Sequence, residues 1–99
     1  MPEPLSDAAR ILGERIRDQR NKFALSQDDI ANLTGMNVSN YGKVERGLIN
    51  PRFYTIIRIA HVLGIDPGIL LTGLTAEDLP EQSHVFTARE FVNERRERG

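Results

Sequence analysis

The chain has 99 residues, 13 basic and 14 acidic side chains, a formal net charge of −1 and no cysteine. This length is sufficient for one hydrophobic core, and the lack of cysteine excludes disulfides, thiolate metal sites and cysteine nucleophiles. The near-zero charge argues against a protein that coats nucleic acid by bulk electrostatics, so any phosphate-binding surface must be local.

The sequence contains no membrane or secretion signal. Residues 1–4 lack the basic and apolar regions of a signal peptide, and no apolar run approaches about 18 residues. We therefore expect a soluble, cytoplasmic protein with no membrane partner.

A capping pattern that marks helix starts recurs along the chain. In each case an apolar residue precedes a polar cap, and a second apolar residue follows four positions after the cap. The four caps are Ser26, Asn37, Asn50 and Asp66. Pro51 and Pro67 would then occupy first helical positions, where a missing N–H costs nothing.

These caps, with glycines as terminators and Ser6 or Asp7 as a first cap, predict five short helices. The expected spans are about residues 7–21, 27–34, 38–46, 51–63 and 67–72. Helical spacing of apolar residues predicts the inward positions. They are Ala8, Ile11, Leu12, Ile16 and Phe23, then Ile30, Ala31 and Leu33, then Phe53, Ile56, Ile57, Ala60 and Leu63. No segment has a strand pattern, so the predicted fold is all-α.

Residues 26–47 carry the functional signal, because they predict two short helices joined by a turn at Gly35, Met36 and Asn37. The small side chain of Ala31 permits a close crossing of the two helices. Their shared apolar seam is expected to contain Ile30, Leu33, Tyr41 and Val44.

This stretch and its surroundings resemble the lambda-repressor-like helix-turn-helix family, also called the xenobiotic-response-element family. The matching strings are Leu25-Ser26-Gln27, Ile30-Ala31, Gly35, Val44-Glu45-Arg46-Gly47, Asn50-Pro51, Ile59-Ala60 and Leu63-Gly64-Ile65. The resemblance covers about residues 10–73 and is distributed over four helices, which makes it more specific than a short motif. It implies a five-helix DNA-binding domain in residues 1–73 and a C-terminal extension in residues 74–99.

The family resemblance also implies roles for individual residues. The third helix of the family lies in the DNA major groove, so the base-reading candidates are Asn37, Val38, Ser39, Asn40 and Lys43. The phosphate-binding candidates are Arg17, Ser26, Gln27, Arg46 and Arg52. Arg20 and Glu45 are expected to form a partly buried ion pair between the first and third helices.

The side-chain chemistry suits these roles. Asn40 offers a donor and an acceptor to a base edge, Val38 can contact a thymine methyl group and Lys43 can donate to guanine. Asn37 is also a helix cap, and a solvated surface is the alternative for each arginine. Two features depart from the common pattern: Tyr41 replaces an aliphatic residue, and Gly42 lies within the helix, close to a neighbouring helix or to DNA.

The C-terminal extension contains a second set of helix signals. Thr75 and Asp78 indicate a single turn before Pro80, and a capping box formed by Thr87 and Glu90 predicts a last helix over residues 88–96. Its apolar content is small, so we expect it to dock on its own domain or on a partner. The alternative is a frayed, charged tail.

One domain of this kind offers few base contacts, so we expect a homodimer on a palindromic DNA site. The first candidates for the interface are Ile69, Leu70, Leu71 and Leu74. The second candidates are Phe86, Phe91 and Val92.

An enzyme is disfavoured by the inventory of side chains. His61 and His84 have no partner at metal-ligand spacing, and no catalytic, metal or cofactor site is predicted. The expected function is therefore transcriptional regulation by a repressor or small controller protein that binds double-stranded DNA. A protein-binding module, such as an antitoxin built on the same fold, is the alternative.

Overall fold

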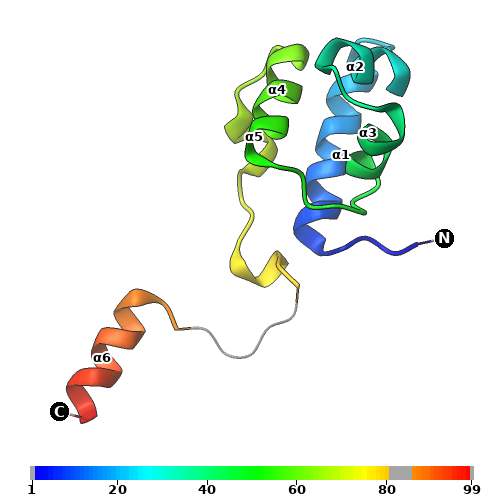
Figure 1. The fold of residues 1–99 in the computed structure, drawn as a ribbon. Coiled ribbons are helices and arrows are strands. Elements are labelled where there is room, and N and C mark those ends of the chain that lie inside the picture. The colour runs from blue at the N-terminus through cyan, green and yellow to red at the C-terminus, as the bar shows by residue number, and fades with distance from the viewer. Residues whose placement is uncertain (1, 81–85, 99) are drawn as a thin grey trace.

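The computed structural model describes residues 2–80 and 86–98, which form α-helices, one 3₁₀ turn and connecting segments (Figure 1). No strand forms within these ranges, and the predicted all-α fold is confirmed. In chain order the elements are α1 (Asp7–Lys22), α2 (Gln27–Thr34), α3 (Val38–Glu45), α4 (Phe53–Leu63), α5 (Pro67–Leu71), η1 (Ala76–Asp78) and α6 (Ala88–Arg98).

Polar caps fix the starts of most of these helices, as the sequence predicts. Ser6, Ser26, Asn37 and Asp66 each accept a hydrogen bond from a backbone N–H in the first turn of α1, α2, α3 and α5. At Ser26 the bonding is reciprocal, because its own N–H donates to Asp29 Oδ2 at 2.9 Å. Each cap satisfies a donor that the helix itself cannot.

The start of α4 differs from the prediction. This helix begins at Phe53 rather than Pro51, and Asn50 is not its cap. Arg52 occupies the cap position with an extended backbone and no side-chain capping bond. Asn50 and Pro51 lie instead in the connection between α3 and α4 (Figure 1). Tyr54, expected to pack beside this cap, is 74% exposed.

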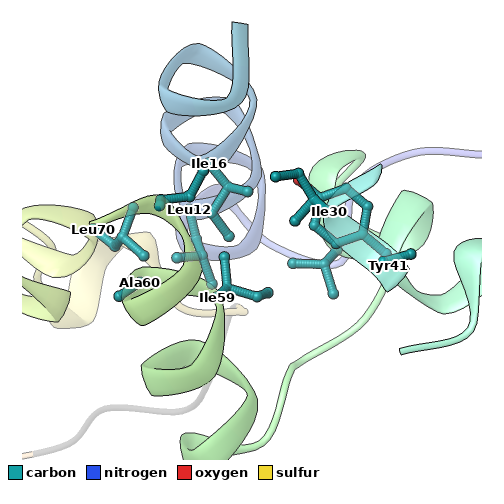
Figure 2. Close-up of a cluster of buried hydrophobic side chains, with 10 residues drawn as sticks. Leu12, Ile16, Ile30, Tyr41, Ile59, Ala60 and Leu70 are labelled. Atoms are coloured by element: carbon teal, nitrogen blue, oxygen red, sulfur yellow. The ribbon is translucent and has the colours of Figure 1, made fainter. Parts of the chain in front are cut away.

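The core surrounds α1. Figure 2 shows Leu12 and Ile16 of α1 between Ala60 and Leu70 on one side and Ile30 and Tyr41 on the other. The buried cluster consists of Leu12, Ile16, Ile30, Ala31, Tyr41, Val44, Ile59, Ala60, Leu63 and Leu70. Because α1 contacts α3, α4 and α5, its position determines how the other helices are arranged.

Several residues predicted to face inward are exposed instead. They are Phe23 at 56%, Leu33 at 63%, Phe53 at 69% and Ile57 at 40%. In α2 the buried positions include Ile30, Ala31 and Thr34, which leaves Leu33 on the other side. Helix α4 carries apolar residues around much of its circumference, and α2 is too short for Ile30, Ala31 and Leu33 to define one stripe, so periodicity alone does not determine which residues face the core.

The structure also corrects the prediction for Leu70. It was expected at a dimer interface, but it is fully buried in the core of its own chain, beside α1 and α4. Its backbone oxygen accepts a hydrogen bond from Arg15 at 3.1 Å. Leu70 follows the Asp66 cap by four positions, and this spacing turns its side chain back toward the core.

The C-terminal extension contains the predicted turn and helix. Thr75 caps η1, and Thr87 and Glu90 form the expected reciprocal capping bonds at the start of α6. Helix α6 ends at Arg98, two residues later than predicted. It contains no buried residue and lies apart from the other helices in Figure 1. None of the described helices is long and apolar enough to cross a membrane.

Candidate nucleic-acid interface

Helices α2 and α3 pack against each other across the predicted turn. Gly35 ends α2 with a positive φ of 72°, and the Met36 N–H donates to the Ala31 carbonyl at 2.8 Å. Met36 packs on the core, and Asn37 then caps α3. The turn therefore fixes the orientation of α3 relative to α2.

One face of α3 is buried and the other is exposed. Tyr41, Val44 and Glu45 are buried, whereas all five predicted base-reading residues are exposed. Residues three and four apart lie on the same side of a helix, so Ser39, Asn40 and Lys43 share one face. We call the exposed set Asn37, Val38, Ser39, Asn40 and Lys43 the recognition surface.

Asn37 has a structural role within this surface. Its Oδ1 accepts hydrogen bonds from the backbone N–H groups of Ser39 at 2.8 Å and Asn40 at 3.3 Å. The oxygen is thus occupied by capping, and the amide nitrogen is the atom of Asn37 that can contact a base.

Glu45 lies on the opposite side of α3, only 1% exposed, and connects three helices. Arg20 of α1 donates to both of its carboxylate oxygens, at 2.7 and 3.0 Å. Gln27 of α2 donates at 3.0 Å, and the Tyr41 hydroxyl of α3 donates as well. The predicted ion pair between Arg20 and Glu45 is present, and it is part of a larger buried network.

The network keeps Glu45 ionised. Burial would raise the pKa of this carboxyl, but hydrogen bonds from Arg20, Tyr41 and Gln27 outweigh burial and hold the pKa below its ordinary value. The hydrogen bond to Glu45 raises the pKa of Arg20. Burial, together with its own bond to Glu45, raises the pKa of the Tyr41 hydroxyl. Arg20 also donates to the Leu25 carbonyl at 2.7 Å, which ties the start of α2 to α1.

Two predicted phosphate ligands belong to this network as well. Arg17 Nε lies 3.6 Å from Glu45 Oε1 and its Nη2 donates to the Glu45 carbonyl at 3.4 Å, so Arg17 does not simply face outward. Gln27 directs its amide nitrogen at Glu45. Both side chains hold α3 in place, and Arg17 is still 42% exposed at the helix surface.

The other phosphate candidates are more accessible. Ser26, Arg46 and Arg52 are exposed, although the Ser26 hydroxyl oxygen is used in the cap of α2. Within residues 2–80 and 86–98, neither Arg46 nor Arg52 forms an ion pair. Their guanidinium groups can therefore meet an external anion.

Gly42 faces a neighbouring helix. A Cβ at this position would lie 2.9 Å from Arg46 Nη1 and 3.3 Å from Gln27 Oε1. Both atoms are side-chain ends, from the end of α3 itself and from α2, and the close approach to DNA that the sequence also left open stays a prediction. The missing side chain gives room to Gln27 and Arg46.

Gly13 was not predicted to have a role, yet it sets the crossing of α1 and α3. A Cβ here would lie 2.5 Å from the Val44 carbonyl oxygen, closer than real atoms approach. Only a residue without a side chain permits this contact. The available signal was a glycine between Leu12 and Ile16, inside an apolar helical stripe.

Metal ligands do not cluster in residues 2–80 and 86–98. Within the described part of the chain, no three His, Asp or Glu side chains gather as metal ligands. His61 is exposed on α4, and His84 lies outside the described residues.

Comparison with known proteins agrees with this geometry. The helix-turn-helix family HTH_3 matches residues 16–70, which is more than half of the chain. The protein therefore belongs to this family and is a DNA-binding helix-turn-helix transcriptional regulator rather than an enzyme.

Individual relatives agree with this assignment. The chain is 33% identical over 72 residues to YonR, an SPbeta prophage-derived HTH-type transcriptional regulator of Bacillus subtilis (strain 168), covering 72% of this chain and 67% of YonR. It is 36% identical over 66 residues to the control protein C.SmaI of Serratia marcescens, covering 67% of this chain and 79% of the relative.

Two solved structures share the fold. The restriction-modification controller protein C.AhdI of Aeromonas hydrophila matches with a TM-score of 0.61 and 37% identity, covering 63% of this chain and 94% of the other. The hypothetical transcription factor NHTF from Neisseria matches with a TM-score of 0.62 and 27% identity, covering 72% and 85%.

Proposed function

We propose that the protein binds a palindromic DNA operator as a homodimer and regulates transcription as a repressor or small controller protein. Residues 1–73 would contact DNA, and residues 74–99 would serve assembly. The main observation in support of the proposal is the exposed recognition surface on α3. The buried network around Glu45 fixes the opposite face of this helix to α1 and α2.

The recognition surface has the chemistry that major-groove recognition needs. Asn40 and Ser39 offer hydrogen-bonding groups that are not buried, and Val38 is 44% exposed beside them. Such groups discriminate between bases in the major groove, with each good pair worth about 1–3 kcal/mol. We assign base recognition to Asn37, Val38, Ser39, Asn40 and Lys43.

Phosphate contacts are assigned to groups around this surface. Arg46 and Arg52 offer free guanidinium groups, and the start of α2 offers the Ser26 hydroxyl as a donor and the backbone N–H of Gln27. Arg17 has a surface position from which it can add a further cation. Since the net charge of the chain is −1, this local cluster must supply the attraction to DNA.

A homodimer is proposed because one recognition surface contacts few bases. Exposed apolar side chains support it: Ile69 and Leu71 in α5, Phe86, Phe91 and Val92 in the extension, and the half-buried Leu74 between them. α4 adds Phe53, Tyr54 and Ile57, which periodicity had partly assigned to the core. The similarity to C.SmaI and C.AhdI supports a controller of this size.

The test is DNA binding by the full chain, measured by fluorescence anisotropy on a duplex selected from the genome of origin. Asn40→Ala is expected to weaken binding to that duplex about tenfold or more, because a base contact is lost. Asn21→Ala changes the same residue type at the exposed end of α1, outside the groups assigned to DNA or to assembly, and is expected to leave binding unchanged. If no duplex binds at low salt, the proposal is wrong and the protein-binding alternative is favoured.

A further inference from the structure

An apolar cavity lies between the N-terminal segment, α1, the approach to α4 and the region after α5. Its volume is about 190 Å³, and it opens to the surface. The lining includes Leu5, Ala8, Ile56, Leu71, Leu74 and Leu79. A smaller cavity of about 150 Å³ accommodates a benzene ring, so this one has room for an aromatic side chain.

The cavity divides the residues predicted for the dimer interface. Leu71 and Leu74 line it, whereas Leu70 is in the core. Ile69 lies elsewhere, beside Arg15 and Gln19 of α1. Of the apolar residues after Pro67, Leu71 and Leu74 therefore line a concave surface, whereas Ile69 does not.

Helix α6 carries exposed apolar side chains that have no partner surface within its own helix. Phe91 is 47% exposed and Val92 is 43% exposed, and no residue of this helix is buried. A helix of 11 residues without tertiary packing is marginally stable in water. Its apolar residues therefore need a surface to pack against, and Figure 1 shows α6 away from its own bundle.

The charges near the two surfaces allow one further contact. Asp7 beside the cavity pairs with Arg10 at 3.7 Å and Asp78 accepts from the Thr75 N–H, which leaves the carboxylate of Glu77, two residues before Leu79, for an external cation. Helix α6 carries four arginines, at positions 89, 95, 96 and 98, against three glutamates. Arg95 lies 5.7 Å from the centre of the Phe91 ring, next to the side chain that would enter the cavity.

We propose that α6 of each copy docks on the other copy and inserts Phe91 into its Leu71–Leu74–Leu79 cavity. This inference rests on the homodimer of the proposed function and specifies how it is held together. In a two-fold dimer each contact occurs twice, so two exchanged helices help a short extension reach the roughly 1,200–2,000 Å² that a stable interface buries. The DNA-binding bundle and its partner would then be linked through residues 74–98.

Cysteine trapping tests the exchange, because the native chain contains no cysteine. Ala8→Cys lies in the cavity lining and Val92→Cys lies beside Phe91. When the two single variants are mixed and oxidised, a disulfide-linked heterodimer is expected. Asp18→Cys, an exposed position on the same helix α1, is the matched control and should give no such product with Val92→Cys.

The double variant Ala8→Cys/Val92→Cys identifies the docking partner. Exchange predicts a covalent dimer, whereas an internal disulfide in a monomer would show that α6 packs on its own chain and would overturn the proposal. The absence of any link in a protein that still dimerises and binds its operator would also overturn it. That last result would contradict the exchange of α6 but not the proposed operator binding by a homodimer, so the experiment distinguishes the two proposals.

A variant without new thiols gives a second measurement. Phe91→Ala is expected to raise the dimer dissociation constant at least about tenfold in sedimentation equilibrium, because buried aromatic anchors dominate interfaces. Phe23→Ala removes a phenylalanine that is 56% exposed just after α1, and this control should not change the dissociation constant. Equal effects, or no effect of Phe91→Ala, would contradict the exchange.

Discussion

Tyr41 and Glu45 lie one helical turn apart in α3, and the tyrosine hydroxyl donates a hydrogen bond to the glutamate carboxylate inside the core. The tyrosine that replaces an aliphatic residue thus supplies a polar partner as well as apolar packing. Together with Arg20 and Gln27 it surrounds the carboxylate, and no buried side-chain polar atom in the described residues lacks a partner. We therefore expect the recognition surface on the exposed face of α3 to depend on this network for its position.

Removing the centre of the network should destabilise the fold. Glu45→Ala leaves Arg20 partly buried without its carboxylate, at an expected cost of about 3–5 kcal/mol in urea unfolding. Tyr41→Phe removes one hydrogen bond and should cost about 1–3 kcal/mol. We expect Glu45→Ala to alter base preference less than stability; normal melting with a changed sequence preference would refute this.

The low pKa of the Glu45 carboxyl couples folding to pH. Its folded-state pKa is below the unfolded value of about 4.3, so its contribution to stability is complete above that pH. The contribution is lost as pH falls through the lowered pKa of the folded state. In urea unfolding from pH 7 to pH 3, the stability difference between the wild type and Glu45→Gln should narrow below about pH 4.3. A pH-independent difference would contradict the assignment.

Two glycines within helices should respond differently to alanine. Gly13→Ala places a Cβ against the backbone of α3, which cannot move away cheaply, and should cost about 2 kcal/mol or more. Gly42→Ala meets only the ends of the Arg46 and Gln27 side chains and gains about 1 kcal/mol of helix propensity, so its net effect should be small. Thermal unfolding of both variants measures the difference in stability between them. Equal destabilisation by the two substitutions would contradict the close contact assigned to Gly13.

Ala24 is the described residue other than glycine with a positive φ, at 56°. This left-handed conformation costs an L-residue about 1–2 kcal/mol, and glycine avoids the cost. Ala24→Gly should therefore stabilise the protein by up to about 1 kcal/mol, after the greater backbone entropy of glycine is subtracted. A lower midpoint in urea unfolding would show that the methyl group of Ala24 contributes more than the strain costs.

Arg46 and Arg52 are expected to act through phosphate charge. Each alanine variant should weaken binding to every duplex about equally and reduce the salt dependence of log K by about one unit of slope. Arg58→Ala removes an exposed arginine of α4 that is assigned neither to DNA nor to the docking of α6, and this control should not change the slope. Loss of discrimination between duplexes in Arg46→Ala or Arg52→Ala would mean that the residue contacts bases instead.

Caps made the helices predictable, because a side chain such as Ser26 or Asp66 marks a start through local hydrogen bonds alone. The start of α4 was mispredicted, since Asn50 has the cap sequence but the chain must cross to the next helix there. Which apolar residues are buried depends on helix packing, and Leu33 and Leu70 show this in opposite directions.

The candidate site was predictable in outline for a similar reason. The exposed face of α3 and the pair Arg20–Glu45 followed from the motif. The places of Arg17 and Gln27 beside Glu45 did not, because they depend on three helices meeting at one carboxylate. The role of Gly13 could not be predicted from the sequence either, because it depends on the crossing of α1 and α3.

The central claim is that two recognition surfaces read one operator, and selection of binding sites from random duplexes by the full chain tests it most directly. We predict two inverted half-sites whose centres lie about one helical turn, or 10 base pairs, apart. Asn40→Ala should lose preference at the same position in both halves. Enrichment of a single unpaired half-site, or of no sequence at all, would contradict the account.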